Sequence, residues 1–202
     1  MQERRQSKAE KHAATRAALL ATARGLFAAK GYAATGTEEV VAQAAVTRGA
    51  LYYHFADKQA LFAAVVEQVA QEVLSAIEAA AAKATSPLDG LIRGSQAFIA
   101  ACLEPGARQI YLIDAPSVIG WQRWREIDAR HGMGSLRQGV EAALADLPRG
   151  QKLSAEALTY LLSGAMNEAV LWLADAGDEA TARKEAEAAL KRILELLFTP
   201  ES

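Results

Sequence analysis

Residues 35–58, TGTEEVVAQAAVTRGALYYHFADK, constrain the fold more tightly than any other part of the chain. Thr35 and Glu38 have the spacing of a capping box, and the acidic pair that begins at Glu38 suits the first turn of a helix, so we expect a helix to begin near Thr37. The apolar pattern of this helix ends at Ala45, where we expect a tight turn before a second helical pattern starts. Two short helices joined by a tight turn are therefore the predicted centre of the fold.

The second of these helices is predicted over about residues 48–55, with Thr47 as its N-cap. Leu51 and Phe55 are one helical turn apart and should face the core. Gly49 is a poor helix former, which favours a close approach of DNA or of another helix at this point. The opposite side carries side chains too polar to be buried together: Thr47, Arg48, Gly49, Tyr52, Tyr53 and His54. Such a helix is typical of the recognition helix of a helix-turn-helix DNA-binding domain.

The wider block over residues 15–62 contains TR..LL..A..LF...GY..T followed by VTRGALYYHFADKQALF. This block resembles, without a gap, the DNA-binding domain of the TetR/AcrR family of one-component bacterial transcriptional regulators. The chain departs from the family pattern at Thr37, Val41 and Ala45, where an apolar residue, alanine and glycine are common. Because alanine resists a positive φ, Ala45 is unusual at the turn.

The resemblance implies an all-α fold of about nine helices. An N-terminal tail and a three-helix DNA-binding domain would occupy residues 1–57, and a helical ligand-binding and dimerisation domain residues 58–202. The charges agree, since residues 1–60 carry nine Lys and Arg against five Asp and Glu, whereas the rest carries thirteen against nineteen. A first scaffold helix is expected over about residues 9–30. Four nearby cations form either a basic arm that reaches DNA or a solvated tail: Arg4, Arg5, Lys8 and Lys11.

In a homodimer, two recognition helices would read the half-sites of a pseudo-palindromic operator, about 34 to 36 Å or a multiple apart. The residues expected to hold phosphates, and so to fix the register, are Thr37, Thr47, Tyr52, Tyr53, His54 and Lys58. The residues expected to face base edges are Arg48, Gly49 and Ala50. Arg48 can bind a guanine through two hydrogen bonds. Asp57 can cap the next helix, and a phosphate at this helix start would account for Lys58, a cation in a first turn.

The C-terminal part of the chain is predicted to be a series of helices. A long apolar pattern over about residues 58–82 predicts a helix of roughly 37 Å, which in the family couples the effector site to the DNA-binding domain. Another helix is expected over residues 87–104. The segment RQIYLIDAPSVIGWQRWREIDARHG follows, with short helices predicted over residues 108–114 and 117–130 on either side of a break at Pro116. Its part DAPSVIGW..WR.ID resembles the C-terminal domain of a subset of TetR-like regulators.

Three further helices are predicted over about residues 134–147, 154–176 and 178–198. The last two contain small residues that permit close helix approach: Ser163, Gly164, Ala165, Ala186 and Ala189. In the family, these two helices pair with their counterparts from a second subunit in a four-helix dimer interface. The core of an ordinary monomer would explain the same pattern.

Candidate effector-binding residues are large or polar side chains of the C-terminal part: Phe98, Cys102, Tyr111, Trp121, Trp124, His131, Met133, Met166, Asn167, Glu168 and Trp172. Most are apolar or aromatic, which suits a lipophilic ligand oriented by a few polar groups. Some of the set is expected to be ordinary core. Trp121 and Trp124 are the leading candidates, because two large rings near a proline break are costly to bury neatly.

We therefore interpret the chain as a ligand-responsive transcriptional regulator, most simply a homodimeric repressor released by a small lipophilic or aromatic effector. Activation in place of repression stays open, as does a regulator that senses a partner protein or acts without a ligand. The remaining alternative is a helical enzyme that uses His131, Asp114, Asp128, Glu168 and Cys102. The sequence shows no metal-ligand spacing, phosphate loop or nucleophile elbow, so we predict no catalytic residue, metal or cofactor. The single cysteine, the lack of a secretion signal and the lack of an apolar run of membrane-spanning length predict a cytoplasmic protein.

Overall fold

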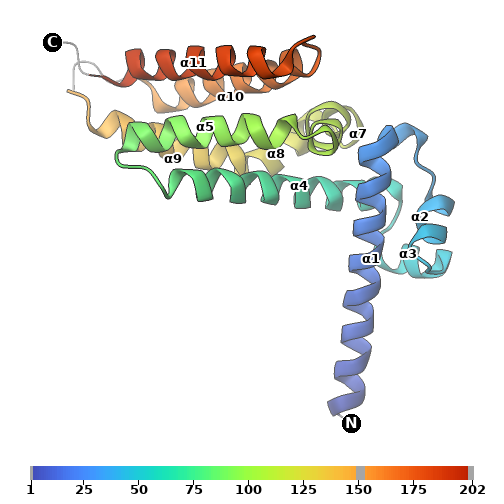
Figure 1. The fold of residues 1–202 in the computed structure, drawn as a ribbon. Helices are drawn as coiled ribbons and strands as arrows, with labels where there is room; N and C mark the ends of the chain where they lie inside the picture. Colours follow the sequence, from blue (N-terminus) through green and yellow to red (C-terminus); the bar gives the residue numbers. More distant parts are fainter. Residues whose placement is uncertain (1, 149–152, 200–202) are drawn as a thin grey trace. The chain divides into compact units, whose positions relative to one another are not determined.

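The computed structural model describes residues 2–148 and 153–199, and the side chains from residue 9 onward; this part of the chain is helical and contains no strand (Figure 1). The predicted all-α class is confirmed. The helices are α1 (Gln2–Ala34), α2 (Thr37–Gln43), α3 (Arg48–His54), α4 (Lys58–Ala81), α5 (Pro87–Leu103), α6 (Pro105–Ala107), the π-helix η1 (Arg108–Asp114), α7 (Ala115–Val118), α8 (Trp121–Arg130), α9 (Gly132–Ala145), α10 (Ala155–Ala174) and α11 (Glu179–Phe198). Three cations of the expected basic arm lie outside the described side chains: Arg4, Arg5 and Lys8.

The chain divides into two compact units. The N-terminal unit consists of Met1–Val69 and Pro105–Arg123, and the C-terminal unit of Ala70–Glu104 and Trp124–Ser202. This division cuts α4 in its middle and assigns α6, η1 and α7 to the unit that contains α2 and α3. The expected boundary between residues 57 and 58 treats each domain as one continuous segment, whereas each compact unit consists of two segments.

Helix α1 holds the N-terminal unit together. Gly31 has φ 77° and ψ 171°, so the regular helix stops there, as the glycine predicted, but it begins at Gln2 and not near residue 9. The Phe27 ring of α1 meets the Phe62 ring of α4 edge to face, with centroids 5.0 Å apart. Tyr32 closes this cluster, because its ring lies 4.9 Å from that of Phe62 and is stacked on Phe27 at 5.8 Å.

Helices α6, η1 and α7 pack on the same scaffold helix or on each other. The helix predicted over residues 108–114 is present, but it is wound as a π-helix. The predicted break at Pro116 is wrong: this proline lies in the first turn of α7, where its missing N–H is tolerated, and the break comes at Gly120, which has φ 85°. Helix α6 approaches α1 so closely that a Cβ on Gly106 would lie 2.9 Å from the Cβ of Ala28.

The C-terminal unit is built around α5, α9 and α10, with α11 packed on α5 and α10. The predicted start of α5 is confirmed, since the Ser86 hydroxyl accepts a hydrogen bond from the backbone N–H of Asp89 at 3.1 Å. Ser154 caps α10 in the same way and accepts from the N–H of Ala157 at 3.2 Å. The apolar core of this unit includes Leu91, Ile99, Cys102, Val140, Leu162, Val170, Leu173 and Leu194.

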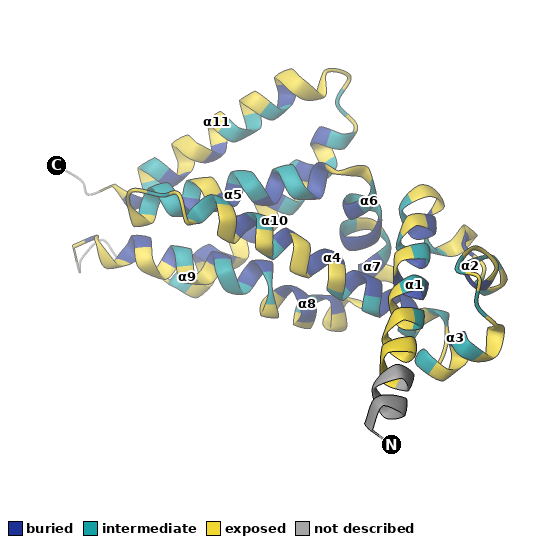
Figure 2. Cartoon of the chain, turned by 60° about the horizontal axis from the view of Figure 1, so that its bottom comes forward, coloured by how far each residue is buried: buried dark blue, intermediate teal, exposed yellow. Residues whose placement is uncertain are grey.

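Apolar side chains stay exposed along α10 and α11, as the burial colours show (Figure 2). On α10 they recur at helical spacing on the side turned away from the core: Leu161, Ala165 and Trp172. On α11 the corresponding residues are Ala189, Ile193 and Leu196. We call these six residues the open apolar face.

Helix α4 is long and apolar enough to cross a membrane by length and composition, so the expectation that the chain lacks an apolar run of this length is wrong. It is the only such helix in the described ranges. Half of its most apolar 18-residue window is buried inside the protein. The burial is that of a helix in a protein core.

Candidate nucleic-acid interface and effector cavity

Helix α2 starts at the expected residue but by another device. Its N-cap is Gly36, which has no side chain to accept a hydrogen bond. Thr35 is buried, and its hydroxyl donates to the carbonyl of Gly31 at 2.8 Å. The predicted capping box is therefore wrong. The Thr35 hydroxyl binds the backbone near the end of α1 and does not cap an N–H group of α2. Glu38 and Glu39 do lie in the first turn, where the helix dipole favours them.

The turn between α2 and α3 is a Schellman motif. The N–H of Val46 donates to the carbonyl of Val41 at 3.1 Å, and the N–H of Ala45 donates to that of Ala42 at 3.3 Å. This pairing needs a left-handed residue at the first position after the helix, and Ala45 has φ 52°. It is the one described residue other than glycine with a positive φ. The turn therefore has regular geometry despite the alanine.

Helix α3 is fixed at both ends as its sequence predicted. Thr47 is its N-cap and accepts from the N–H of Ala50 at 3.1 Å. Leu51 is fully buried and Phe55 nearly so, which holds the opposite side outward. A Cβ on Gly49 would meet nothing nearer than the Thr47 hydroxyl at 3.9 Å, so no other helix of the described chain closes on it. Of the two explanations for the glycine, the approach of another helix therefore has no support within the described chain, and an approach by DNA stays a prediction.

Of the nine residues expected to contact DNA, five are exposed and four are half-buried. Tyr53 is 74% exposed. The other exposed members are Thr47, Arg48, Gly49 and Tyr52. The half-buried members are Thr37, Ala50, His54 and Lys58. None of the nine is buried, so each can be reached from solvent without unfolding the domain.

Arg48 is held by a neighbour that the sequence pattern did not reveal. Its guanidinium forms an ion pair with Glu38 of α2 at 2.9 Å and lies 5.6 Å from the centre of the Tyr52 ring. Both charged side chains are about two thirds exposed, and such pairs contribute about 0 to 1 kcal/mol. The guanidinium can therefore exchange Glu38 for a guanine or a phosphate with little loss.

Two histidines meet beside α3. The rings of His12 and His54 lie 4.1 Å apart, and Tyr53 stands edge-on to His12 at 5.4 Å. Burial lowers the pKa of His54, and the charges of His12 and Arg16 lower it further. The neutral form is therefore favoured in the free protein, whereas a DNA phosphate beside it would favour the cation.

Lys58 has partners inside the N-terminal unit. Its ammonium lies 4.0 Å from the centre of the Tyr32 ring, and burial lowers its pKa while the charge of Asp114 opposes this. Asp114 in turn accepts a hydrogen bond from the backbone N–H of Tyr32 at 2.8 Å. Asp57 caps α4 as predicted, through the N–H of Ala60 at 2.7 Å. Lys58 thus lies at the capped start of α4, next to Tyr32 and under the influence of Asp114 of the π-helix η1.

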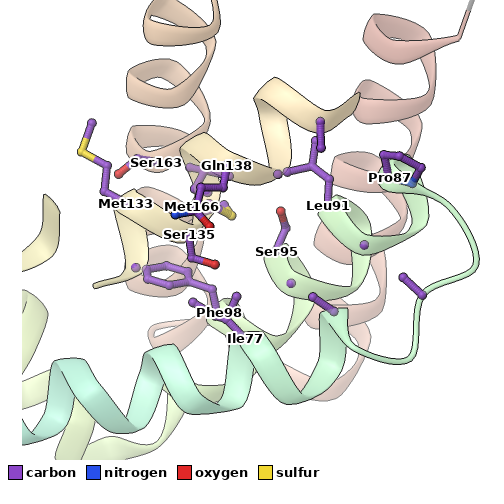
Figure 3. Close-up of a pocket in the computed structure, with 18 of the residues that line it drawn as sticks. Ile77, Pro87, Leu91, Ser95, Phe98, Met133, Ser135, Gln138, Ser163 and Met166 are labelled. Atoms are coloured by element: carbon purple, nitrogen blue, oxygen red, sulfur yellow. The ribbon is translucent and has the colours of Figure 1, made fainter. Parts of the chain in front are cut away.

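A cavity of about 370 Å³ lies within the C-terminal unit (Figure 3). It is bounded by α4, α5, α9, α10 and the end of α8. Three predicted effector residues line it: Phe98, Met133 and Met166. Most other lining residues are apolar or glycine, and the polar ones are Ser86, Ser95, Asp128, Ser135, Gln138 and Ser163.

The other eight predicted effector residues do not line this cavity. Tyr111 and Trp121 belong to the N-terminal unit, the first buried and the second 63% exposed. Cys102 and Trp124 are buried elsewhere in the C-terminal unit. The remaining members are His131 and Asn167, which are half-buried, and Glu168 and Trp172, which are exposed.

The pair of tryptophans does not form one surface. Trp124 is buried, whereas Trp121, the first residue of α8, is exposed. Arg125 and Asp128, three residues apart on α8, form an ion pair at 2.9 Å. Burial raises the pKa of the Cys102 thiol, so this group stays protonated and is a poor nucleophile.

The serines of the cavity were not among the predicted effector residues. Leu91, Ser95 and Phe98 recur at helical spacing on α5. This apolar stripe, which contains a serine, was the sequence pattern from which the cavity wall could have been predicted. Ser163 was noted only as a small residue for close helix packing. Its second property, a hydroxyl at the cavity, depends on how α10 is rotated against α5 and α9.

Comparison with known proteins gives two family matches. Residues 88–197 match the Tetracyclin repressor-like, C-terminal domain, and residues 19–65 match the bacterial regulatory proteins of the tetR family. Among curated proteins, the Transposon Tn10 TetC protein of Escherichia coli is 26% identical over 160 residues, which are 77% of this chain and 78% of that protein. The A-factor receptor protein of Streptomyces griseus is 36% identical over 76 residues, which are 38% of this chain and 25% of that protein.

Solved structures agree. The crystal structure of a TetR-family transcriptional regulator from Pectobacterium atrosepticum is 34% identical, with 94% of this chain and 97% of that chain covered and a TM-score of 0.74. The structure of RolR in complex with resorcinol is 20% identical, with 96% and 98% covered and a TM-score of 0.68, a likeness of fold. With its helix-turn-helix, its helical C-terminal unit and these matches, the chain belongs to the TetR family of transcriptional regulators, which are DNA-binding transcription factors and not enzymes.

Proposed function

We propose that the chain is a homodimeric repressor that binds a pseudo-palindromic operator through α3 and leaves it when a small lipophilic effector enters the cavity. The observation that carries the DNA-binding part is the outer side of α3. There, Arg48, Tyr52 and Tyr53 are exposed together on a helix whose other side is anchored by Leu51. A short rigid helix with such a surface fits the major groove.

In this proposal the nine interface residues divide by role. Arg48, with Gly49 and Ala50, faces base edges, and the guanidinium supplies discrimination of roughly 1 to 3 kcal/mol when it binds a guanine through two hydrogen bonds. The others hold phosphates and fix the register of the protein on the duplex: Thr37, Thr47, Tyr52, Tyr53, His54 and Lys58.

Dimerisation is proposed through α10 and α11, and the open apolar face supports it. Leu161 is 70% exposed and Leu196 is 64% exposed. Gly164 and Ala165, between Leu161 and Trp172, allow another helix to come close to α10. A second copy of the chain would bury this face on both sides of a two-fold axis and would set the separation of the two recognition helices.

The effector would act by shifting a population. A molecule that binds more tightly to a conformation in which the two recognition helices no longer match adjacent half-sites must weaken operator binding by the same coupling energy. The cavity favours this over a regulator that senses only a partner protein, because its space is not filled by side chains. Such a regulator would work in the cytoplasm, where its operator is.

The test begins with an operator fragment found by genomic footprinting with the purified protein. Fluorescence anisotropy at two salt concentrations should show tight, salt-dependent binding of two chains to each fragment. Arg48→Ala should bring the affinities for operator and scrambled DNA closer together, by roughly 5- to 100-fold. Lys58→Ala should weaken binding to both alike and lower the salt slope by about one.

Arg137→Ala is the control, because this arginine is exposed on α9 in the C-terminal unit and pairs with Glu141 at 2.9 Å. It should change neither the affinity nor the selectivity. If Lys58→Ala relaxes sequence preference and Arg48→Ala does not, the assignment of roles within α3 and α4 is reversed. If no DNA sequence is selected at all, the repressor proposal fails.

A further inference from the structure

The cavity of the C-terminal unit has two different ends. A Cβ on Gly139 would lie 3.2 Å from the Leu91 side chain, and one on Gly132 would lie 3.9 Å from the Phe98 ring, so α5 and α9 run antiparallel along the cavity. At one end the lining residues of these helices are buried, as at Phe98. At the other end they are exposed, and these are Ser86, Pro87, Gln138 and Ala142.

The deep part of the cavity is lined by two serines. Ser95 is 4% exposed and Ser163 is 6% exposed, and they come from α5 and α10 (Figure 3). Neither takes part in a hydrogen bond with another described residue, unlike Thr159 one turn before Ser163, whose hydroxyl donates to the carbonyl of Ala155 at 2.7 Å. Because these hydroxyls line the cavity, a polar group of a bound molecule can form hydrogen bonds with them, whereas a wholly apolar ligand would cover them at a cost.

The charges around the cavity exclude a charged ligand group. Among its described lining residues none is Lys, Arg or His. Asp128 is the single ionisable lining residue, and its carboxylate is held by the Arg125 guanidinium at 2.9 Å. An anion would be buried beside this carboxylate without a cation of its own, and a cation would have to compete with Arg125.

The walls between the two ends are apolar. Ile77, Leu91, Leu136 and Met166 contribute aliphatic surface, and a volume of about 370 Å³ is at the small end of the range of ligand cavities. Resting on the proposed function, in which this cavity holds the effector, we propose that the effector is an uncharged, largely apolar molecule. One end of this molecule carries a hydroxyl, carbonyl or amide group. That end lies in the deep part of the cavity, where the polar group forms hydrogen bonds with the hydroxyls of Ser95 and Ser163.

Equilibrium dialysis of the full chain against probes with one carbon skeleton tests this directly. The probes are naphthalene, 2-naphthol, 2-naphthoate and 2-naphthylmethylamine at neutral pH. 2-Naphthol should bind about three- to tenfold more tightly than naphthalene, since it adds a hydrogen bond to the same apolar contact. 2-Naphthoate and the protonated amine should each bind at least tenfold more weakly than 2-naphthol.

The double variant Ser95→Ala, Ser163→Ala should bring the ratio of the 2-naphthol and naphthalene affinities close to one while naphthalene still binds, which also shows that the cavity is intact. Ser75→Ala is the matched control, because Ser75 is exposed on α4 and its hydroxyl donates to the Gln71 carbonyl at 2.9 Å. Its ratio should equal that of the unchanged protein. An unchanged ratio in the double variant, equal binding of 2-naphthoate, or no binding of any probe would overturn the proposal.

Operator release is measured separately, by adding 2-naphthol to the protein bound to its operator fragment. If 2-naphthol binds with the expected preference but the operator is not released, the chemistry assigned to the cavity holds and the proposed regulation by it fails. If the operator is not bound in the first place, the repressor proposal fails while the dialysis result stands.

Discussion

Replacing Ala45 by glycine should stabilise the protein. In the Schellman turn after α2 this alanine has φ 52°, a left-handed conformation that costs an L-residue with a Cβ roughly 1 to 2 kcal/mol. Glycine removes that cost but gives the unfolded chain more freedom, which takes back about 0.4 to 1 kcal/mol. The net gain is about 0 to 1.6 kcal/mol, with a central value of about 0.8 kcal/mol. Since Ala45 is exposed, no packing is lost. For a chain of this length the melting temperature should rise by roughly 1 to 4 °C.

The adjacent Ala44 provides a matched control. It is the C-cap of α2 and has φ −75° and ψ −4°, in the right-handed region. Ala44→Gly should therefore destabilise the protein by about 0.5 to 1 kcal/mol, opposite in sign to Ala45→Gly. Thermal unfolding followed by far-ultraviolet circular dichroism, on both variants in one buffer, measures the difference. If both glycines lower the melting temperature, the strain assigned to Ala45 is refuted.

Two further outcomes follow from the surfaces of the protein. Leu161→Glu should raise the dimer dissociation constant at least a hundredfold in sedimentation equilibrium, because each dimer loses two buried leucines worth about 1.5 to 3 kcal/mol apiece. The control is Lys184→Glu, which should leave the dissociation constant unchanged. Lys184 lies on the opposite side of α11 from Ile193. The pKa of His54 lies below its ordinary value, so its protonation destabilises the free protein as pH falls below about 6.5. DNA phosphate favours the protonated form, so operator affinity at constant ionic strength should increase from pH 8 to pH 6. His54→Phe should flatten this dependence. A loss of operator affinity toward pH 6 in the unchanged protein would contradict the prediction.

Much of the fold was predictable because its signals are local. Thr47, Asp57, Ser86 and Ser154 each cap the helix that follows them, since a side-chain oxygen needs only the N–H group three residues ahead. Thr35 has the same chemistry and the same spacing, yet it turns back to Gly31 because the loop after α1 buries it. Capping patterns therefore fail where tertiary burial offers the hydroxyl another partner.

The candidate sites were only partly predictable, because they depend on elements distant in sequence. The recognition face could be read from α3 alone, but the Glu38 that holds Arg48 comes from α2. Trp121 and Trp124 lie one turn apart at the start of α8, but only Trp124 is covered by the core, so the burial of each ring could not be predicted from their spacing. The cavity serines required the antiparallel packing of α5 and α9 and the rotation of α10, which no periodicity within one helix specifies.

The glycines that line the cavity have a consequence for its evolution. A methyl group added at Gly94 would meet the Cγ2 methyl of Ile77 at 3.3 Å, at Gly139 the Cδ1 methyl of Leu91 at 3.2 Å, and at Gly90 the Ala84 Cβ at 3.5 Å. The Leu91 methyl is the far end of a flexible side chain, the Ile77 methyl belongs to a stiffer β-branched side chain that must give way by a few tenths of an ångström, and the Ala84 Cβ is at ordinary contact distance. Glycine-to-alanine exchanges can therefore narrow the cavity in methyl-sized steps while the large apolar residues of the core stay in place. Effector preference can diverge among descendants of this chain through substitutions that leave the DNA-binding elements untouched.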